Sequence, residues 1–453
     1  MSGTFVAKRS HADRSECGFG IAWRFCTRVD VTMSPIPLQL LPDSAHVVDG
    51  QLHIGGCSLL ELAEEFGTPL FVYDEQQLRD RCREAVAVFG DGVAYATKAF
   101  LCKEMARLAH AEGMHLDVAT GGELHVACSA GVPPERLVLH GNNKSGTELR
   151  TALMAGVGRV VVDSFDELDR LEDLHARFGL RAKVLLRLTP GIRAQTHEFV
   201  ATGHDDTKFG FTVSNGTADD AIARARGSEA VELMGVHAHI GSQVFCVSSL
   251  ARAVEVIAAA ASGYHLPELS VGGGLGVAYV TGETAPSITE WGEIVKKTCA
   301  DLGVEARVLA EPGRSIVAAA AVTLYRVGTM KRIEGVRTYV SVDGGMSDNP
   351  RPVLYGSGYE AFAPRTVEAE RPMTVTVVGK HCESGDVLVH DAKVPADLAV
   401  DDILATAVTG AYGHSMGSNY NKVLRPAVVF VSSGAARIVV RRETFDDLTR
   451  LDV

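Results

Sequence analysis

The sequence predicts an α/β protein that combines a (β/α)8 TIM barrel with a C-terminal, mostly antiparallel β-domain of sandwich or barrel type. Two observations support this prediction. Eight short, apolar, β-rich segments recur between Val93 and Glu311, and most are separated by stretches with helical periodicity. After about Ser315 the pattern changes to short, alternating segments rich in β-branched residues, which is typical of antiparallel sheets.

The bulk properties indicate a globular protein with more than one domain. Its 453 residues exceed what one hydrophobic core usually supports. A formal net charge of −12, from 44 basic and 56 acidic side chains, argues against general binding to nucleic acid or to a membrane surface. The 9 cysteines include no C-x-x-C spacing, and no apolar run reaches the roughly 20 residues of a membrane span. We therefore expect a cytoplasmic protein without nucleic-acid or membrane partners.

The N-terminal part of the chain is expected to lie outside the barrel. Residues 1–32 carry charges throughout, show neither a helical nor a strand period and lack the apolar segment of a secretory signal, so we expect a disordered extension. The segment 33–68 includes the strand-like HVVDGQLHIGG and is expected to pack on the β-domain. The predicted barrel domain then covers residues 69–315, and the β-domain covers residues 316–453.

The expected barrel strands are short, and glycine-ended helical stretches separate them. Helical segments such as KEMARLAHAEG and SFDELDRLEDLHARFG repeat apolar residues at spacings of three and four. Eight strand–helix units favour a closed barrel over an open doubly wound sheet. The strands are VAYATKA from Val93, LDVAT from Leu116, RLVLH from Arg136, RVVVD from Arg159, VLLRLT from Val184, GVHAHI from Gly235, LSVGGG from Leu269 and VLAEPG from Val308.

Two further regions complete the predicted fold. The polar segment TPGIRAQTHEFVATGHDDTKFGF separates the fifth and sixth barrel strands, and its length and composition are typical of a functional loop. The expected strands of the second domain are AVTLYRVGTMKR, RTYVSVDGG, MTVTVVGK, ATAVTGAY, AVVFVSSG and ARIVVRRE.

Lys98 ends the first expected barrel strand, and strand alternation places it on the same face as Ala94 and Ala96. Active sites of such barrels lie at the carboxyl ends of the strands, so a polar group there indicates function. The two small residues leave room for a flat ring above the amine. A lone lysine at a strand end more often extends to solvent, and its neighbours therefore decide the interpretation.

Three other strand ends supply these neighbours. His239 lies at the end of the sixth strand, the run Gly272–Gly276 ends the seventh, and Glu311 begins the EPGRS turn after the eighth. Glycine-rich turns after the last two barrel strands commonly bind phosphate through backbone N–H groups. A lysine that can form an imine, an imidazole, a carboxylate and a phosphate site together indicate pyridoxal phosphate as the cofactor, without a metal ion.

Ten motifs in order carry a resemblance to a known family. Over roughly residues 40–445 the chain resembles the fold-type III pyridoxal-phosphate-dependent decarboxylases, the alanine-racemase-like barrels, and among them the diaminopimelate decarboxylases. Each motif is weakly specific, but ten in family order are strongly so. The motifs are YATKA, DVATGGEL, HGNNKS, KFGF, HAHIGSQ, GGGLG, EPGRS, VDGGMSDNPRPVLY, CESGD and GAYGHSMGSNYN.

The resemblance implies a set of cofactor-binding residues. Lys98 would hold the cofactor as a Schiff base, His239 would stack on its ring, and Glu311 would meet the pyridine nitrogen. Asp117 would lie near Lys98 and His239. The phosphate and its surroundings would be bound by Ser242, Gly274, Gly313, Arg314 and Tyr412.

The resemblance also implies a substrate and an assembly. Arg314, Arg351, Tyr355 and Tyr412 would bind the distal end of the substrate beside Glu383. Independently of any resemblance, the planar guanidinium groups of arginines are well suited to bind a second carboxylate of the substrate. Cys382 would donate a proton within the active site of the neighbouring subunit, so a homodimer with shared active sites is implied. The implied reaction converts meso-diaminopimelate to L-lysine and CO2 in lysine biosynthesis.

The sequence is also compatible with other activities. A relative with the same residues can act on another carboxylated amine, of the carboxynorspermidine type or from secondary metabolism. His414 and Gly417 replace the Phe and Ser expected in this family, which bears on specificity. A metal-dependent barrel hydrolase would use His237 and His239, which share a strand face, as zinc ligands. A regulatory relative would lack Lys98 or Cys382, and a racemase would not need the CESGD donor.

Overall fold

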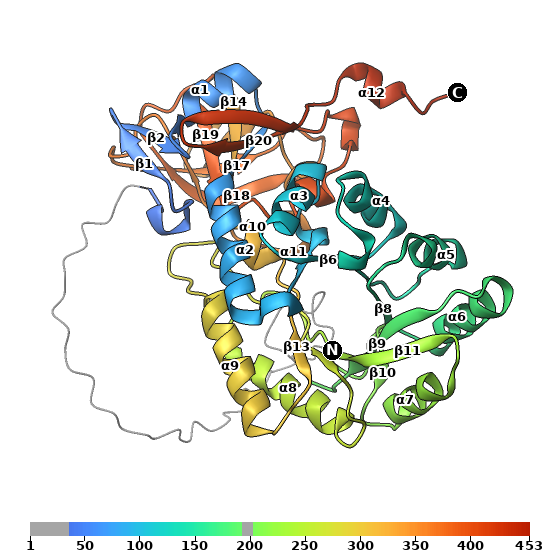
Figure 1. Cartoon of the computed structure of the whole chain (residues 1–453). Helices are drawn as coiled ribbons and strands as arrows, with labels where there is room; N and C mark the ends of the chain where they lie inside the picture. The colour runs from blue at the N-terminus through green and yellow to red at the C-terminus, as the bar shows by residue number, and fades with distance from the viewer. Residues whose placement is uncertain (1–35, 193–202) are drawn as a thin grey trace, which may run out of the picture. The chain divides into compact units, whose positions relative to one another are not determined.

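The computed structural model describes residues 36–192 and 203–453 (Figure 1). The expected disordered extension, residues 1–32, and the centre of the expected functional loop, residues 193–202, lie outside the described residues. Among the helices that are described, none combines the length and the apolar character needed to cross a membrane.

Eight parallel strands form the predicted barrel, and each overlaps one of the segments that the sequence indicated. Each strand pairs with the next one along the barrel. A parallel bridge between Val93 and Ala310 joins the last strand to the first, so the ring is closed. The strands are β5 (Ala94–Ala96), β6 (His115–Val118), β7 (Leu137–Leu139), β8 (Arg159–Val162), β9 (Ala182–Thr189), β11 (Val231–His237), β12 (Glu268–Ser270) and β13 (Arg307–Leu309), with β10 (Phe211–Thr212) paired to β9.

Helices cover the outside of the barrel, and local sequence signals fix their ends. A Ser or Thr side chain caps four of the eight barrel helices, and two of these residues, Ser145 and Ser287, each form a reciprocal capping box with a glutamate three residues later. Gly179 ends its helix in the left-handed conformation at φ 66°. The helices are α2 (Glu75–Phe89), α3 (Lys103–Ala111), α4 (Gly121–Ser129), α5 (Gly146–Ala155), α6 (Phe165–Phe178), α7 (Thr217–Gly227), α8 (Val247–Ala261) and α9 (Ile288–Asp301).

The second sheet is mostly antiparallel, as predicted, although β15 pairs in parallel with β17 and β4 with β20. The blue elements that precede the barrel in the chain lie beside the orange and red strands of this sheet (Figure 1). The sheet contains β4 (Leu70–Asp74), β14 (Ala321–Ile333), β15 (Arg337–Val342), β16 (Ala361–Phe362), β17 (Met373–Val378), β18 (Val387–Val394), β19 (Ile403–Ala407), β20 (Ala427–Ser432) and β21 (Ala435–Val440).

Shorter elements complete the fold. The strand-like segment HVVDGQLHIGG forms the first two strands of a separate three-stranded sheet, and Leu52 within it donates a backbone hydrogen bond to Pro364 O at 2.9 Å. The segment therefore contacts the β-domain. These elements are β1 (His46–Val48), β2 (Gln51–Ile54), β3 (Cys57–Ser58), α1 (Leu59–Phe66), α10 (Arg314–Val317), α11 (Arg351–Tyr355) and α12 (Phe445–Thr449).

The predicted start of the barrel domain at residue 69 is wrong, because strand β4 belongs to the second sheet. Strand β4 pairs there antiparallel with β14 and parallel with β20. All five of its residues are buried. A continuous apolar run such as LFVYD suits any strand covered on both faces, so the sequence pattern does not distinguish the two sheets. The barrel's own elements begin with α2, directly after β4.

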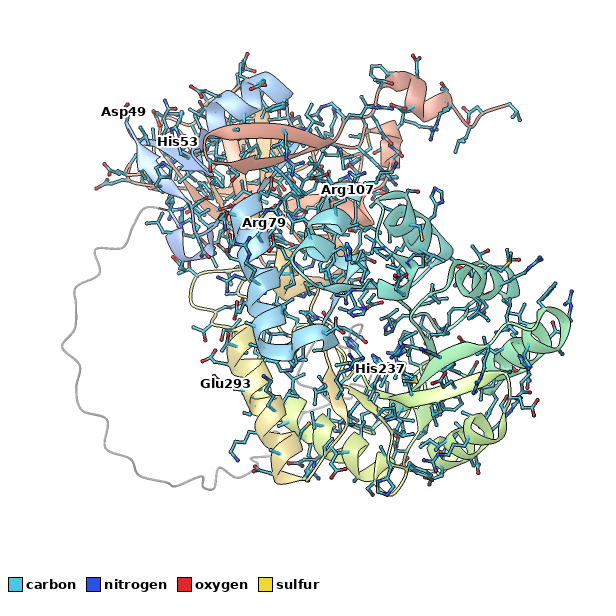
Figure 2. The ribbon with its side chains drawn as sticks, viewed as in Figure 1. Asp49, His53, Arg79, Arg107, His237 and Glu293 are labelled. Carbon is cyan, nitrogen blue, oxygen red and sulfur yellow. The ribbon has the colours of Figure 1, made fainter. Side chains whose placement is uncertain are left out.

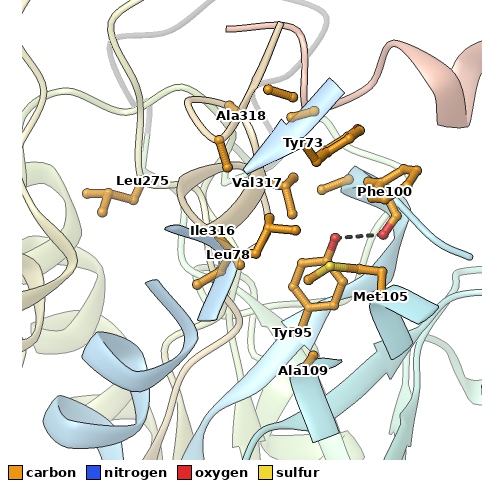
Figure 3. Packing of buried hydrophobic residues seen from close by; sticks show 14 of the residues in the cluster. Tyr73, Leu78, Tyr95, Phe100, Met105, Ala109, Leu275, Ile316, Val317 and Ala318 are labelled. Atoms are coloured by element: carbon orange, nitrogen blue, oxygen red, sulfur yellow. Dashed lines mark hydrogen bonds between the residues drawn. The ribbon is translucent and has the colours of Figure 1, made fainter. Parts of the chain in front are cut away.

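The second domain joins the barrel at the rim where its strands end. Tyr412 N donates to Ala99 O at 2.8 Å, which ties the loop after β19 to the turn after β5. Tyr73 of β4 stacks on Phe100, with ring centroids 4.5 Å apart. Figure 3 shows these two rings beside Tyr95, whose hydroxyl donates to Phe100 O at 2.6 Å. This shared core fixes residues of both domains around the carboxyl ends of the barrel strands.

Candidate active site

A cavity of about 650 Å³ opens at the carboxyl ends of the barrel strands, with α11 and the loop after β19 along its side. A smaller recess adjoins it, and every one of the nine predicted cofactor-binding residues lines that recess. They are Lys98, Asp117, His239, Ser242, Gly274, Glu311, Gly313, Arg314 and Tyr412. Arg351 and Tyr355 line the larger cavity. The structure therefore brings the barrel and β-domain predictions together in one place.

Lys98 lies in a short 3-10 turn, Thr97–Ala99, directly after β5. The turn, rather than the strand alternation expected from the sequence, directs its exposed side chain into the cavity. Thr97 Oγ1 donates to Asp117 O at 2.8 Å and holds this turn against the next strand. Although the surrounding protein desolvates the amine, neighbouring Tyr412 and Asp117 outweigh this effect and raise the pKa of Lys98.

His239 presents a neutral ring to the same cavity. It follows β11, and Gly273 N donates to its Nδ1 at 3.2 Å, so the proton of the neutral ring lies on Nε2. Desolvation, together with the positive charges of Lys98 and Arg187, lowers the pKa of His239 well below its usual value. A flat, uncharged imidazole in this position can stack on another ring without adding a second positive charge.

Glu311 is a buried and ionised carboxylate. Ser270 Oγ donates to its Oε1 at 3.1 Å, and His237 Nε2 lies 3.0 Å from its Oε2. Burial raises the pKa of Glu311, but the attraction of His237 and His140 outweighs burial and holds the pKa well below the usual range. The result is a fixed negative charge at the wall of the recess, which favours a protonated ring nitrogen facing it.

His140 connects two acidic groups and was not singled out from the sequence. Its Nε2 lies 3.3 Å from Glu311 Oε1 and 3.7 Å from Asp117 Oδ1. Burial raises the pKa of Asp117 to about 6, which makes this carboxyl easier to protonate than Glu311. Burial opposes a charge on His140, but Asp117 and Glu311 raise its pKa. His140 is therefore protonated more readily than an isolated histidine, between the two carboxyl groups beside Lys98.

Arg187 is a second functional candidate that the sequence reasoning missed. It lies within β9, lines the cavity, and has its guanidinium 4.1 Å from the ring centroid of Phe209. Asp163 Oδ2 accepts from Arg187 at 3.5 Å, while Asp163 Oδ1 accepts from Gly210 N at 2.6 Å. A charged residue inside the buried run VLLRLT was the available signal, as was a histidine at the end of RLVLH for His140.

The proposed zinc pair, His237 and His239, is not grouped as a metal site. Within the described residues, the candidate ligand atoms of His237 lie with those of His140 and Glu311, all within 4.8 Å of one another. His237 is 1% exposed among the barrel strands (Figure 2), whereas His239 faces the cavity. Because Glu311 engages His237 Nε2, the two histidines serve different partners.

Two buried arginines line the cavity. Arg314 donates from NH1 to Tyr279 OH at 2.7 Å and from NH2 to Ser242 Oγ at 2.8 Å. Arg351, which is 4% exposed, donates from NH1 to Tyr359 OH at 2.6 Å. Among the described residues, no carboxylate lies within salt-bridge distance of either guanidinium. Two buried cations without an acidic partner indicate a binding place for an anionic group.

Cys382 and Glu383 lie outside the cavity of their own chain. Both are exposed in the turn between β17 and β18, and neither lines the cavity or the recess. Cys382 N donates to Asn421 Oδ1 at 3.3 Å, and Glu383 Oε1 accepts from Tyr420 OH at 2.5 Å. The structure thus brings together the predicted site residues except these two.

His414 packs beside aromatic residues and does not line the cavity. Its ring makes edge contacts with Phe71 and Phe100, at centroid distances of 5.8 and 5.7 Å. Desolvation lowers its pKa to about 4, so the imidazole is neutral. His414 therefore occupies an aromatic packing position, where a neutral imidazole takes the place of the expected phenylalanine ring. Nearby Met416 lines the cavity.

The recess fits a phosphate-bearing ring. Gly274 has φ 112°, and a Cβ on it would lie 2.1 Å from Gly241 O, so only glycine keeps this wall open. The Ser242 hydroxyl and the Arg314 guanidinium provide donors suited to phosphate. Lys98, His239 and Glu311 supply an amine, a flat neutral ring and an ionised carboxylate around the same space. This donor set matches the chemistry of pyridoxal phosphate.

Comparison with known proteins gives one consistent family. The family model described as "Pyridoxal-dependent decarboxylase, pyridoxal binding domain" matches residues 75–318, a range that begins directly after β4. The chain is 47% identical over 425 residues to diaminopimelate decarboxylase of Mycobacterium tuberculosis, with 89% of this chain and 95% of that protein covered. It is 45% identical over 420 residues to diaminopimelate decarboxylase of Bacillus subtilis, with the same coverage of 89% and 95%.

A solved structure agrees with these relatives. Diaminopimelate decarboxylase from M. jannaschii in co-complex with L-lysine has a TM-score of 0.85 to this chain at 32% identity, covering 91% of this chain and 98% of that one. The predicted α/β fold and the decarboxylase resemblance are thereby confirmed, and the metal-dependent hydrolase alternative is wrong. The chain belongs to the diaminopimelate decarboxylase family of pyridoxal-dependent decarboxylases.

Proposed function

We propose that this protein uses pyridoxal phosphate to decarboxylate meso-diaminopimelate to L-lysine and CO2, a step of lysine biosynthesis. The observation that carries the proposal is the pair of buried guanidiniums of Arg314 and Arg351, which line the same cavity as Lys98. The cavity therefore has a reactive amine and a cationic place for a second carboxylate. The name of the curated relatives and the L-lysine bound in the M. jannaschii structure support the proposal.

The cofactor is proposed to occupy the recess. Lys98 Nζ would hold it covalently, His239 would lie against its ring, and Glu311 would face its nitrogen. Asp117 would contribute a second, more weakly acidic carboxyl. The phosphate of the cofactor would bind to the backbone and side chains of Ser242, Gly274, Gly313, Arg314 and Tyr412. When bound, pyridoxal phosphate supplies an electron sink for the negative charge that loss of CO2 leaves on the α-carbon.

The protein's own groups set the conditions for that chemistry. The ionised Glu311, held by Ser270 and His237, would favour a proton on the ring nitrogen of a bound cofactor. The uncharged His239 would lie against one face of the cofactor ring and limit the access of water to that face. Lys98 Nζ takes and returns protons beside Asp117, whose raised pKa of about 6 lets it exchange a proton near neutral pH.

Binding of the distal end orients the reacting end. Arg314 and Arg351, with Tyr355 and Tyr412 beside them, would bind the second carboxylate of the substrate. Fixing this end leaves the other carboxylate at the proper place beside Lys98, so distant binding energy contributes to orientation. A substrate that ends in an ammonium group, such as ornithine, would meet two guanidiniums and be repelled.

We also propose that the working unit is a homodimer in which Cys382 and Glu383 complete the partner's active site. Both residues are exposed and outside the cavity of their own chain. Several apolar side chains near the cavity and near Glu383 are exposed as well, by between 37% and 48%: Phe245, Val353, Leu354 and Tyr420. A second copy that covers them would bury this apolar surface. Cys382 Sγ would then hold the proton for the α-carbon.

The proposed location is the cytoplasm. All seven cysteines within the described residues are free thiols, which supports a reducing compartment.

A CO2-release assay with a panel of amino acids tests the proposed reaction. The panel contains meso-diaminopimelate, lysine, ornithine, arginine and carboxynorspermidine. We expect release from meso-diaminopimelate, with L-lysine formed in equal amount, and little or none from the others, because the distal site is cationic. Preferential conversion of ornithine or carboxynorspermidine would contradict the proposed substrate.

A further inference from the structure

Tyr279 contacts both arginines of the cavity at the same time. It lies in the loop between β12 and α9 and is 4% exposed. Its hydroxyl oxygen accepts from Arg314 NH1 at 2.7 Å. The face of its ring lies against Arg351, whose guanidinium carbon is 4.1 Å from the ring centroid. One side chain thus uses its hydroxyl for one cation and its aromatic face for the other.

The position of Tyr279 is itself fixed by its surroundings. Gln243 pairs with the backbone of Val277, donating to its oxygen at 2.6 Å and accepting from its nitrogen at 3.2 Å. Tyr279 N donates to Glu283 Oε2 at 2.8 Å. The ring packs edge-on against Tyr359, with centroids 5.3 Å apart and planes at 74°. Because Tyr359 OH accepts from Arg351, the two tyrosines hold that guanidinium from two sides.

Tyr279 stands behind the cavity wall. Arg314 and Arg351 line the cavity, whereas Tyr279 lines neither the cavity nor the recess. A substrate in the cavity would therefore touch the two guanidiniums and not this tyrosine. Any effect of Tyr279 on the reaction must act through the arginines, which makes it a positioning residue.

The arrangement answers an electrostatic problem. Two buried guanidiniums repel each other, and among the described residues neither has a carboxylate within salt-bridge distance. An aromatic face and a hydroxyl oxygen both present partial negative charge to cations. Tyr279 supplies both without cancelling the positive charge. The cations are held in place and remain available to an incoming carboxylate.

We propose that Tyr279 sets the spacing of Arg314 and Arg351 and thereby determines the selectivity of the enzyme for substrates with a distal carboxylate. This inference rests on the proposed function, in which the two arginines bind the second carboxylate of the substrate. It extends the specificity determinants to a residue that the substrate does not contact.

Tyr279→Phe tests the role of the hydroxyl because it keeps the ring under Arg351 and removes the acceptor for Arg314. We expect the KM for meso-diaminopimelate to rise by about tenfold or more, the scale of a hydrogen bond to a charged group, with a much smaller change in kcat. Tyr279→Leu removes the aromatic face as well and is expected to raise KM further. Tyr264→Phe is the matched control: this tyrosine also lies against an arginine, Arg226, but outside the cavity.

Calorimetric titration of the holoenzyme with pimelate gives a second measurement that does not depend on turnover. Pimelate carries two carboxylates and no amine, so its affinity reports on carboxylate binding alone. We expect Tyr279→Phe to weaken pimelate binding by a factor similar to the rise in KM, while Tyr264→Phe binds as the wild type does. Melting temperatures equal to that of the wild type would show that both variants remain folded.

The outcomes separate this inference from the proposed function. Unchanged KM and pimelate affinity in Tyr279→Phe would overturn the positioning role. A fall in kcat as large as the rise in KM would also overturn it, because it would indicate a merely structural effect. A wild-type enzyme that does not convert meso-diaminopimelate would contradict the proposed substrate. In that event, weaker pimelate binding by Tyr279→Phe would still support the role of Tyr279 in holding the two arginines.

Discussion

Lys98→Ala is expected to lose the visible absorbance of bound cofactor and to reduce CO2 release by at least about 10³-fold, the scale of losing a covalent catalytic group. Lys98 is the only lysine of the described residues that lines the recess, and its neighbours Asp117, His239 and Glu311 converge on the same space. Without its amine, the cofactor has no covalent attachment, and the exchange of protons beside Asp117 is lost.

Absorbance spectroscopy and the CO2-release assay measure these two losses. Lys297→Ala is a suitable control, because Lys297 lies on the surface of α9, 73% exposed, and pairs there with Asp301. The control is expected to match the wild type in both measurements. An active Lys98→Ala enzyme without bound cofactor would show that the assignment of Lys98 is wrong.

Cys382→Ala is expected to keep the cofactor absorbance and to reduce turnover by about 10²- to 10⁴-fold, the range for loss of a general acid. Cofactor binding and turnover are expected to respond differently because Cys382 is exposed and does not line the recess of its own chain. Its loss therefore leaves the cofactor site intact and removes only the proposed proton donor. Cys246→Ala is a matched control, because Cys246 is also an exposed free thiol.

Mixing the two inactive variants tests whether the active site is shared between subunits. A heterodimer of Lys98→Ala and Cys382→Ala contains one site with both Lys98 and Cys382. If subunits exchange at random, half the dimers are mixed and each has one complete site, so about one quarter of wild-type activity is expected. Absence of rescue after exchange has been confirmed by mass measurement of the mixed dimer would contradict a shared site.

The barrel follows from the sequence because its pattern is local and repeated. Each strand includes a short apolar run, most helices have a 3.6-residue period, and glycine or a polar cap marks many of their ends. Strand β4 is the exception, because its run LFVYD is equally suited to the barrel and to the second sheet. Its partners β14 and β20 lie about 250 residues or more away in the chain, and no local pattern specifies such pairing.

The nine cofactor-binding predictions converge on one recess because strand ends of a closed barrel meet at one rim. His140 and Arg187 were open to the same reasoning, since each places a charged or polar side chain at the end of, or within, a buried strand. Tyr279 was not. Its significance lies in simultaneous contact with Arg314 and Arg351, which depends on packing between a barrel loop and α11.

The location of the cofactor on the chain tests the proposed role of Lys98 most directly. Borohydride reduction of the purified holoenzyme fixes pyridoxal phosphate to the amine that carries it, and peptide mass spectrometry identifies that residue. We expect one modified site, Lys98, in the peptide that contains YATKA. Attachment to Lys144, Lys208 or any other lysine, or a fully active enzyme with no attachment at all, would contradict that role.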